Sequence, residues 1–161
     1  SEAGLCALQY RSDLVRAKNK ALWLLGKRDY SKKEMIKKLK PDFDADAAAE
    51  AVELLCECGM IDDERFARRY ANDLVAFNGL SKRAVIMELT LKGIDRELST
   101  AVADELEYDE TQIIKDIIGR RYADCLYDEK SMRRMYNAFA RKGYSYSAVK
   151  HALNEYIEEQ E

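Results

Sequence analysis

Few side chains in this sequence of 161 residues are of the types that carry out catalysis or bind metals. The chain has four cysteines but a single histidine, so a zinc site of Cys and His ligands is not predicted. We expect the histidine, His151, at the surface or in an interface. Cys56 and Cys58 are too close in sequence for an ordinary disulfide, and we expect reduced thiols, some of them buried. The pair Asp62-Asp63 lies in a predicted turn, and no glycine-rich phosphate loop occurs. We therefore expect no catalytic residue, no metal and no cofactor.

Basic side chains, in contrast, recur at fixed positions. Three serines are spaced by fifty residues, and two positions after them stand Lys33, Arg83 and Arg133. If the repeats stack regularly, these cations form a column that suits an acidic helical partner or a phosphate backbone. The alternative is that these charged faces are simply solvated. The candidate partner-binding residues are this column and the cations near it, namely Lys32, Lys33, Arg68, Arg69, Lys82, Arg83, Lys92, Arg133, Arg134 and Lys142.

The serines themselves mark a structural repeat. Ser31, Ser81 and Ser131 are each followed by apolar residues four, five and eight positions later, which is one face of an amphipathic helix. Each serine is therefore predicted to cap the N-terminus of a helix, and Ser31 forms a capping box with Glu34. Twelve positions after the serine, repeats 2 and 3 have a glycine preceded by lysine, and this Lys-Gly stop is predicted to end the helix. Repeat 1 has Phe43 there, just after Pro41, and proline also ends a helix. These positions are Phe43, Gly93 and Gly143.

Another helix is predicted before and after each of these central helices. Asp44, Asp95, Asp109 and Ser145 are candidate caps for four of them, and Asp62 or Asp63 for a fifth. The predicted flanking helices are 17–25, 45–58, 64–77, 96–106, 111–126 and 146–158. No segment has the alternation typical of a strand. We therefore predict an all-α fold of three tandem three-helix repeats, stacked into an elongated, curved array. The expected division is an N-terminal extension, 1–16, followed by repeats at 17–61, 62–108 and 109–161.

Charge follows the predicted repeat, although the net charge is only −3. The first two helices of each repeat are basic and the third is acidic, which predicts a basic and an acidic face. The acidic total argues weakly against nucleic acid as the main partner. No apolar run reaches the ~20 residues that span a bilayer, so no membrane association is expected. Trp23 and the ten tyrosines could stack on bases, but most fall on apolar stripes, and we expect them to pack in the core.

The segment Gly59-Met60-Ile61-Asp62-Asp63-Glu64-Arg65-Phe66 resembles the signature of the RecX family, bacterial regulators of the RecA recombinase. Glu88-Leu89-Thr90-Leu91-Lys92-Gly93-Ile94 is similar to that family's second-repeat motif, and the segment 28–39 to its first. Repeat 1 departs from the pattern by having Lys40-Pro41-Asp42 where a glycine is common.

The resemblance implies a non-enzymatic module that binds the RecA filament on single-stranded DNA along its groove. Such proteins inhibit the recombinase, ATPase and coprotease activities in DNA repair, homologous recombination and the SOS response. On this basis we expect a cytoplasmic monomer, with weak direct DNA binding. Two alternatives are a helical-repeat protein that binds DNA directly through its basic face and a helical scaffold for some other protein.

Overall fold

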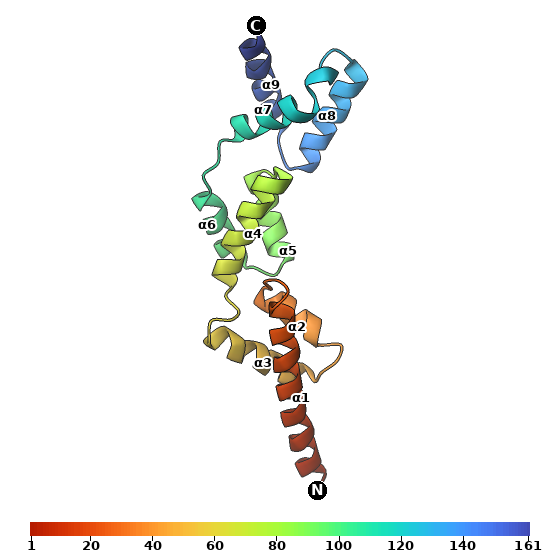
Figure 1. The fold of residues 1–161 in the computed structure, drawn as a ribbon, viewed down its shortest axis with the longest axis vertical. Helices are drawn as coiled ribbons and strands as arrows, with labels where there is room; N and C mark the ends of the chain where they lie inside the picture. Colours follow the sequence, from red (N-terminus) through yellow and green to blue (C-terminus); the bar gives the residue numbers. More distant parts are fainter. The chain divides into compact units, whose positions relative to one another are not determined.

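In a computed structural model that describes all 161 residues, the chain is helical and contains no strand. The prediction of an all-α protein built from three-helix repeats is confirmed. Figure 1 shows the order of the helices along the chain. They are α1 (Glu2–Leu25), α2 (Lys32–Leu39), α3 (Ala45–Glu57), α4 (Asp63–Asn78), α5 (Lys82–Leu91), α6 (Arg96–Glu105), α7 (Glu110–Arg121), η1 (Ala123–Cys125), α8 (Glu129–Arg141) and α9 (Tyr146–Gln160).

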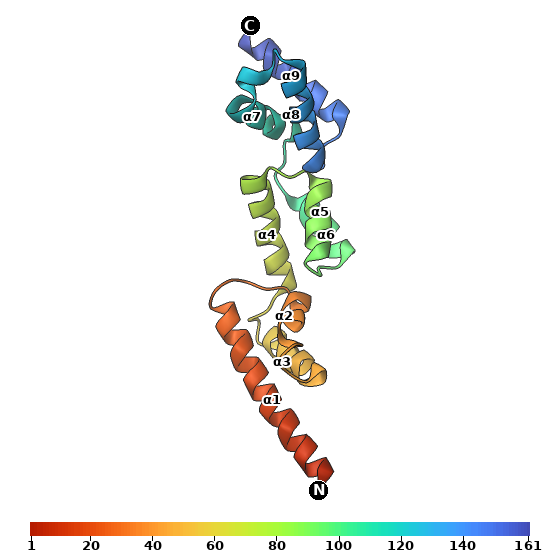
Figure 2. The same ribbon diagram turned by 90° about the vertical axis from the view of Figure 1, so that its right-hand side faces the viewer.

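The chain forms two compact units, to both of which repeat 2 contributes. The first unit comprises Ser1–Arg69 with Leu89–Leu98, and the second comprises Tyr70–Glu88 with Ser99–Glu161. The proposed repeat boundaries at 17–61, 62–108 and 109–161 therefore stay a prediction. The expected extension at residues 1–16 is helical and continuous with the first helix of repeat 1, so α1 is 24 residues long. Figure 2 shows its N-terminal part running past α3.

The core of the first unit combines alanines on α1 and α3 with larger apolar residues on α2 and α3. Ala17 and Ala21 of α1 are fully buried, which lets this helix approach α3 closely. Met35 and Leu39, four and eight positions after Ser31, are also fully buried, as the predicted stripe requires. The apolar face of α3 completes this cluster with Ala48, Ala51, Val52 and Leu55.

The second unit repeats this pattern in the last three helices. Met135 and Phe139 are buried on α8 against the apolar faces of α7 and α9. In repeat 2, which contributes to both units, Val85 and Leu89 of α5 are fully buried four and eight positions after Ser81. The stripe that recurs every fifty residues therefore predicted buried side chains correctly at offsets four and eight in all three repeats. The residues at offset five, Ile36, Ile86 and Tyr136, are only partly buried.

Most of the predicted helix caps are confirmed. Ser31 and Ser81 accept hydrogen bonds from the amides of the third residue after each, at 3.1 Å in both cases. Asp44, Asp62, Asp95, Asp109 and Ser145 also cap their helices. The Glu34 half of the predicted capping box is wrong, because its carboxylate binds Arg28 and Lys92 instead.

The prediction that Ser131 caps a helix is also wrong. Asp128 takes the cap position three residues earlier, and its carboxylate accepts from the Ser131 amide at 3.0 Å and from its hydroxyl at 2.6 Å. An aspartate is at least as good an N-cap as a serine, so α8 begins at Glu129. The preceding helix correspondingly ends at Arg121 rather than at Leu126, and the chain turns through η1.

Repeat 1 and repeat 2 are joined at the Lys92-Gly93 turn. The Ser31 hydroxyl donates to the Lys92 carbonyl while it caps α2, and the Lys92 ammonium contacts Glu34 at 3.2 Å. Burial alone would raise the pKa of Glu34, but the hydrogen bonds from Arg28 and Lys92 outweigh it and lower that pKa. Gly93 has φ +86°, and a Cβ there would lie 2.5 Å from Cβ of Lys33. Only glycine therefore fits this contact between repeats.

The junction of repeats 2 and 3 is formed by the same two elements fifty residues later, an N-cap serine and a Lys-Gly turn. The Ser81 amide donates to the Lys142 carbonyl at 3.0 Å, and the Lys142 ammonium donates to the Asn78 carbonyl. Gly143 has φ +90°, and a Cβ there would clash with the Ser81 hydroxyl and lie 2.9 Å from Cβ of Ala84. In both junctions, a Lys-Gly turn thus docks on the buried N-cap serine of the repeat before it.

Two positions depart from the repeat pattern. Repeat 1 has Phe43 in place of the glycine. Phe43 packs instead on the core next to α1, with Arg16 5.6 Å from the centre of its ring. Ser131 is only partly buried, whereas Ser31 and Ser81 are buried under the docked turns.

We predict unequal costs for removing the serine hydroxyls. Ser31→Ala deletes the cap and leaves the Lys92 carbonyl without its hydrogen bond, so it should lower the free energy of unfolding by about 1–3 kcal/mol. Ser131→Ala is the matched control and should change it by less than about 0.5 kcal/mol. Urea unfolding followed by circular dichroism measures both, and equal losses would contradict the assignment.

The second prediction concerns Gly143. Gly143→Ala combines the strain of a positive φ, about 1–3 kcal/mol, with a clash against repeat 2. Gly59→Ala carries the same strain at φ +74°, but its Cβ would meet nothing within 4 Å. The Gly143 variant should therefore unfold at a lower urea concentration than the Gly59 variant. The reverse order would show that the docked turn does not stabilise the protein.

Candidate partner-binding surface

The acidic pair in the most specific sequence motif has a structural role. The Asp62 carboxylate caps α4 by accepting from the Glu64 and Arg65 amides at 3.0 and 3.1 Å. The Asp63 carboxylate accepts from the Lys32 amide at 2.7 Å, at the N-terminus of α2. The Arg65 guanidinium donates back to the Gly59 and Met60 carbonyls. The motif is thus a turn whose polar groups bind one another, as the prediction of caps and turn formers requires.

Three of the ten candidate cations form short, exposed ion pairs. The Lys32 ammonium lies 2.6 Å from Glu53 of α3. Arg68 contacts Glu64 one helical turn away at 2.8 Å, and Arg69 contacts Asp29 at 2.9 Å. All of these pairs are substantially exposed, so each contributes little to stability and could exchange for another anion.

Lys92 and Lys142 hold the repeats together. Each is only half-exposed, and each side chain binds an oxygen of the preceding repeat. Burial, with a smaller contribution from nearby Arg121, lowers the pKa of Lys142. The sequence analysis predicted both lysines as partner-binding cations and as part of the turn that ends a helix, and it did not foresee these contacts between repeats.

The remaining candidates carry charge that is available to a partner. Lys33, Lys82, Arg83 and Arg134 form no ion pair, and Arg133 makes only a long contact of 3.8 Å with Glu129. Lys33 belongs to the first unit, whereas Arg83 and Arg133 belong to the second. The column through these three positions stays a prediction, but each of its members has an exposed side chain.

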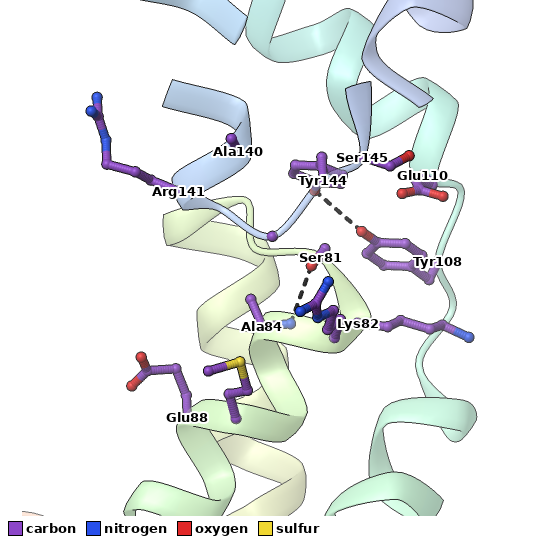
Figure 3. A pocket seen from close by; sticks show the side chains of 13 residues that line it. Ser81, Lys82, Ala84, Glu88, Tyr108, Glu110, Ala140, Arg141, Tyr144 and Ser145 are labelled. Atoms are coloured by element: carbon purple, nitrogen blue, oxygen red, sulfur yellow. Dashed lines mark hydrogen bonds between the residues drawn. The ribbon is translucent and has the colours of Figure 1, made fainter. Parts of the chain in front are cut away.

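Within the second unit, a groove of about 750 Å³ lies beside the junction of repeats 2 and 3. One side is the start of α5, and the other is the turn between α8 and α9, as Figure 3 shows. Tyr108 and Glu110 close one end, away from Arg141. The charged residues that line the groove are Lys82, Arg83, Glu88, Glu110 and Arg141.

Two tyrosines fix the wall of this groove. The Tyr144 hydroxyl donates to the Gly79 carbonyl at 2.8 Å, and the Tyr108 hydroxyl lies 3.2 Å from that of Tyr144. Burial is the main cause that raises the pKa of both phenols, so both stay protonated. The loop before α7 and the turn before α9 are thereby tied to the loop between α4 and α5.

Arg141 is the groove residue that sequence reasoning missed as a candidate site. It makes no ion pair and is exposed at the end of α8. Its position relative to the repeat serine is occupied by Pro41 in repeat 1 and Leu91 in repeat 2, so no recurrence of charge marked it. The sequence did contain one indication that Arg141 is exposed. It lies on the same polar face of α8 as Arg134, just before the Lys142-Gly143 turn.

Other chemical candidates are dispersed. His151 is exposed beside Glu155, as expected. All four cysteines are free, but none is buried, contrary to the expectation for some of them. Trp23 is 60% exposed beneath the Lys27 ammonium, so the expectation of core packing is wrong for this residue.

No group of three or more His, Cys, Asp or Glu side chains is placed to hold a metal ion. None of the helices has the length and apolarity that crossing a membrane requires.

Comparison with known proteins gives one consistent family. Residues 17–55 match the first three-helix domain of RecX, and residues 62–102 match its second three-helix domain. The regulatory protein RecX of Syntrophotalea carbinolica is 32% identical over 80% of this chain and 88% of its own length. The regulatory protein RecX of Mycolicibacterium smegmatis is 36% identical over 82% of this chain and 74% of its own.

Solved structures agree on the fold. The crystal structure of RecX from Lactobacillus salivarius superposes with a TM-score of 0.72 at 20% identity, covering 91% of this chain and 98% of that one. A second crystal structure of a regulatory protein RecX gives a TM-score of 0.75 at 17% identity, covering 96% and 78%. With the family matches and the relatives above 30% identity, these likenesses lead to one conclusion. The chain belongs to the RecX family of regulatory proteins.

Proposed function

We propose that this protein binds the RecA nucleoprotein filament on single-stranded DNA and restrains its recombinase, ATPase and coprotease activities. The observation that carries this proposal is family membership through both three-helix domains. The protein would act as a cytoplasmic monomer in DNA repair, homologous recombination and the SOS response. A binding role without catalysis agrees with the use of Asp62 and Asp63 as helix caps.

The exposed cations are the groups that such binding would use. They lie on the central helix of each repeat and are exposed, namely Lys33 on α2, Arg83 on α5, and Arg133 and Arg134 on α8. A filament of protein and DNA presents repeated carboxylates and phosphates, and repeated cations complement both. Because these side chains are mostly free of internal ion pairs, little has to be broken when a partner binds.

A direct role on DNA is the second candidate, and the outer face of α8 favours it. Lys130, Arg133, Arg134 and Arg141 are all exposed on this one helix. Binding to bare single-stranded DNA would weaken with salt, with a log–log slope of about −0.7 for each phosphate neutralised. A steep slope together with tight binding in the absence of RecA would favour this candidate over the filament.

We predict that the protein slows ATP hydrolysis by RecA on single-stranded DNA at well below equimolar ratio. Binding to a filament can halt many RecA subunits at once, so inhibition should not require one molecule per subunit. The measurement is steady-state ATP hydrolysis at fixed RecA and DNA. Excess DNA serves as the control, because it should relieve inhibition only if the protein acts by sequestering DNA. An unchanged rate at equimolar protein would refute the proposed function.

A further inference from the structure

The groove beside the second repeat junction has preformed walls. The Lys142-Gly143 turn is fixed on Ser81, and Tyr144 is hydrogen-bonded to the Gly79 carbonyl. The N-cap bond from the Ala84 amide to Ser81 fixes the start of α5 on the opposite side. Figure 3 shows these elements facing one another, with the bonds of Ser81 and Tyr108 drawn. A site whose walls are already ordered loses little conformational entropy when a ligand binds.

The groove also contains charge with no internal partner. Lys82, Arg83 and Arg141 form no ion pair, although Lys82 lies 5.7 Å from the centre of the Tyr108 ring. Arg83 comes from α5 and Arg141 from the end of α8, so the groove has cationic residues on two different elements. In Figure 3 the Arg141 side chain extends outward at the rim, where a segment that leaves the groove would pass it. A guanidinium is best satisfied by a carboxylate or a phosphate in bidentate geometry.

The other lining residues distinguish between these two anions. Glu88 and Glu110 line the same groove, and they would repel a continuous chain of phosphates more than a segment that carries only a few carboxylates. Met87 is 58% exposed there, and Ala84, Ala140 and Tyr108 add apolar surface. Surfaces that bind nucleic acid are more uniformly basic, whereas Arg, Tyr and Met are enriched where proteins bind proteins. The mixture of charges and apolar groups therefore favours a polypeptide.

The volume of the groove suits a short peptide segment of a partner and is too small for a folded domain. About 750 Å³ lies within the range of ~300–1,000 Å³ that holds a drug-sized ligand, equivalent to a few side chains. Such a segment would place an apolar side chain against Met87 and Tyr108. Carboxylates on either side of that residue would reach Arg83 and Arg141.

We propose that this groove is the docking site for a carboxylate-bearing, partly apolar segment of the RecA partner. The inference rests on the proposed function, and it specifies the part of this chain that meets the protein component of the filament. Arg83 and Arg141 pair with the carboxylates of the segment, and Met87 contacts its apolar side chain. The groove exists only where repeats 2 and 3 are docked, so partner binding depends on that junction.

The test uses the full chain with Arg83→Glu and Arg141→Glu combined. The concentration that halves RecA ATP hydrolysis on single-stranded DNA should rise about tenfold or more, since two charge-assisted contacts become repulsive. The control is Arg120→Glu combined with Lys150→Glu, two exposed cations of the same unit that form no ion pair. This control reverses the same number of charges and should inhibit like the parent protein. Helicity by circular dichroism verifies folding, and Arg83→Gln with Arg141→Gln replaces the glutamate variant if that variant loses helicity.

Fluorescence anisotropy with a bare single-stranded oligonucleotide forms the second arm. Loss of inhibition with unchanged oligonucleotide affinity supports a protein segment in the groove. Parallel loss of inhibition and of oligonucleotide affinity overturns the proposal in favour of nucleic acid. Full inhibition by the double variant would refute the groove as the docking site and would leave the proposed function intact. Failure of the parent protein to inhibit RecA at all overturns the proposed function, and this proposal with it.

Discussion

The docking of a Lys-Gly turn on the N-cap serine of the preceding repeat is the contact on which this structure depends. A repeat of about fifty residues in three short helices buries too little apolar surface to be very stable alone. The serine serves two purposes at once, because it caps its own helix and receives the turn of the next repeat. The glycine is required for a positive φ and for the absence of a side chain at the contact.

This contact also explains how a sequence with a small net charge can present a basic surface. At each junction, Lys92 and Lys142 are turned inward to oxygen atoms of the preceding repeat. The cations near the N-termini of α2 and α5, Lys33 and Arg83, remain exposed beside the docked turns. The same element that joins the repeats therefore places unpaired cations next to a rigid wall, and in the second unit that wall borders a groove.

Local patterns predicted the helices and their cores because both are set by near neighbours. The offsets that placed Met35, Val85 and Met135 on an apolar stripe correctly predicted three buried side chains. The prediction for Ser131 failed because Asp128, three residues earlier, competes for the same amide, and pattern matching favoured the serine that recurred.

Contacts between distant residues were beyond prediction from a single sequence. Lys92 and Glu34 are 58 positions apart, and nothing local marks them as partners. Arg141 was missed for a related reason, since the groove that gives it a role forms only when two repeats dock. The residues that recur identify the repeat, whereas the residues that make the groove specific are the ones that differ between repeats.

In the proposed mode of binding, this RecX-family protein contacts its partner at the junction of repeats 2 and 3. Hydrogen–deuterium exchange of the full chain, free and bound to RecA filaments on single-stranded DNA, tests it most directly. Binding is expected to slow exchange at the start of α5, in the loop around Tyr108 and in the turn at 140–145. Slowed exchange confined to α1 and α3, with these three segments unchanged, would contradict it.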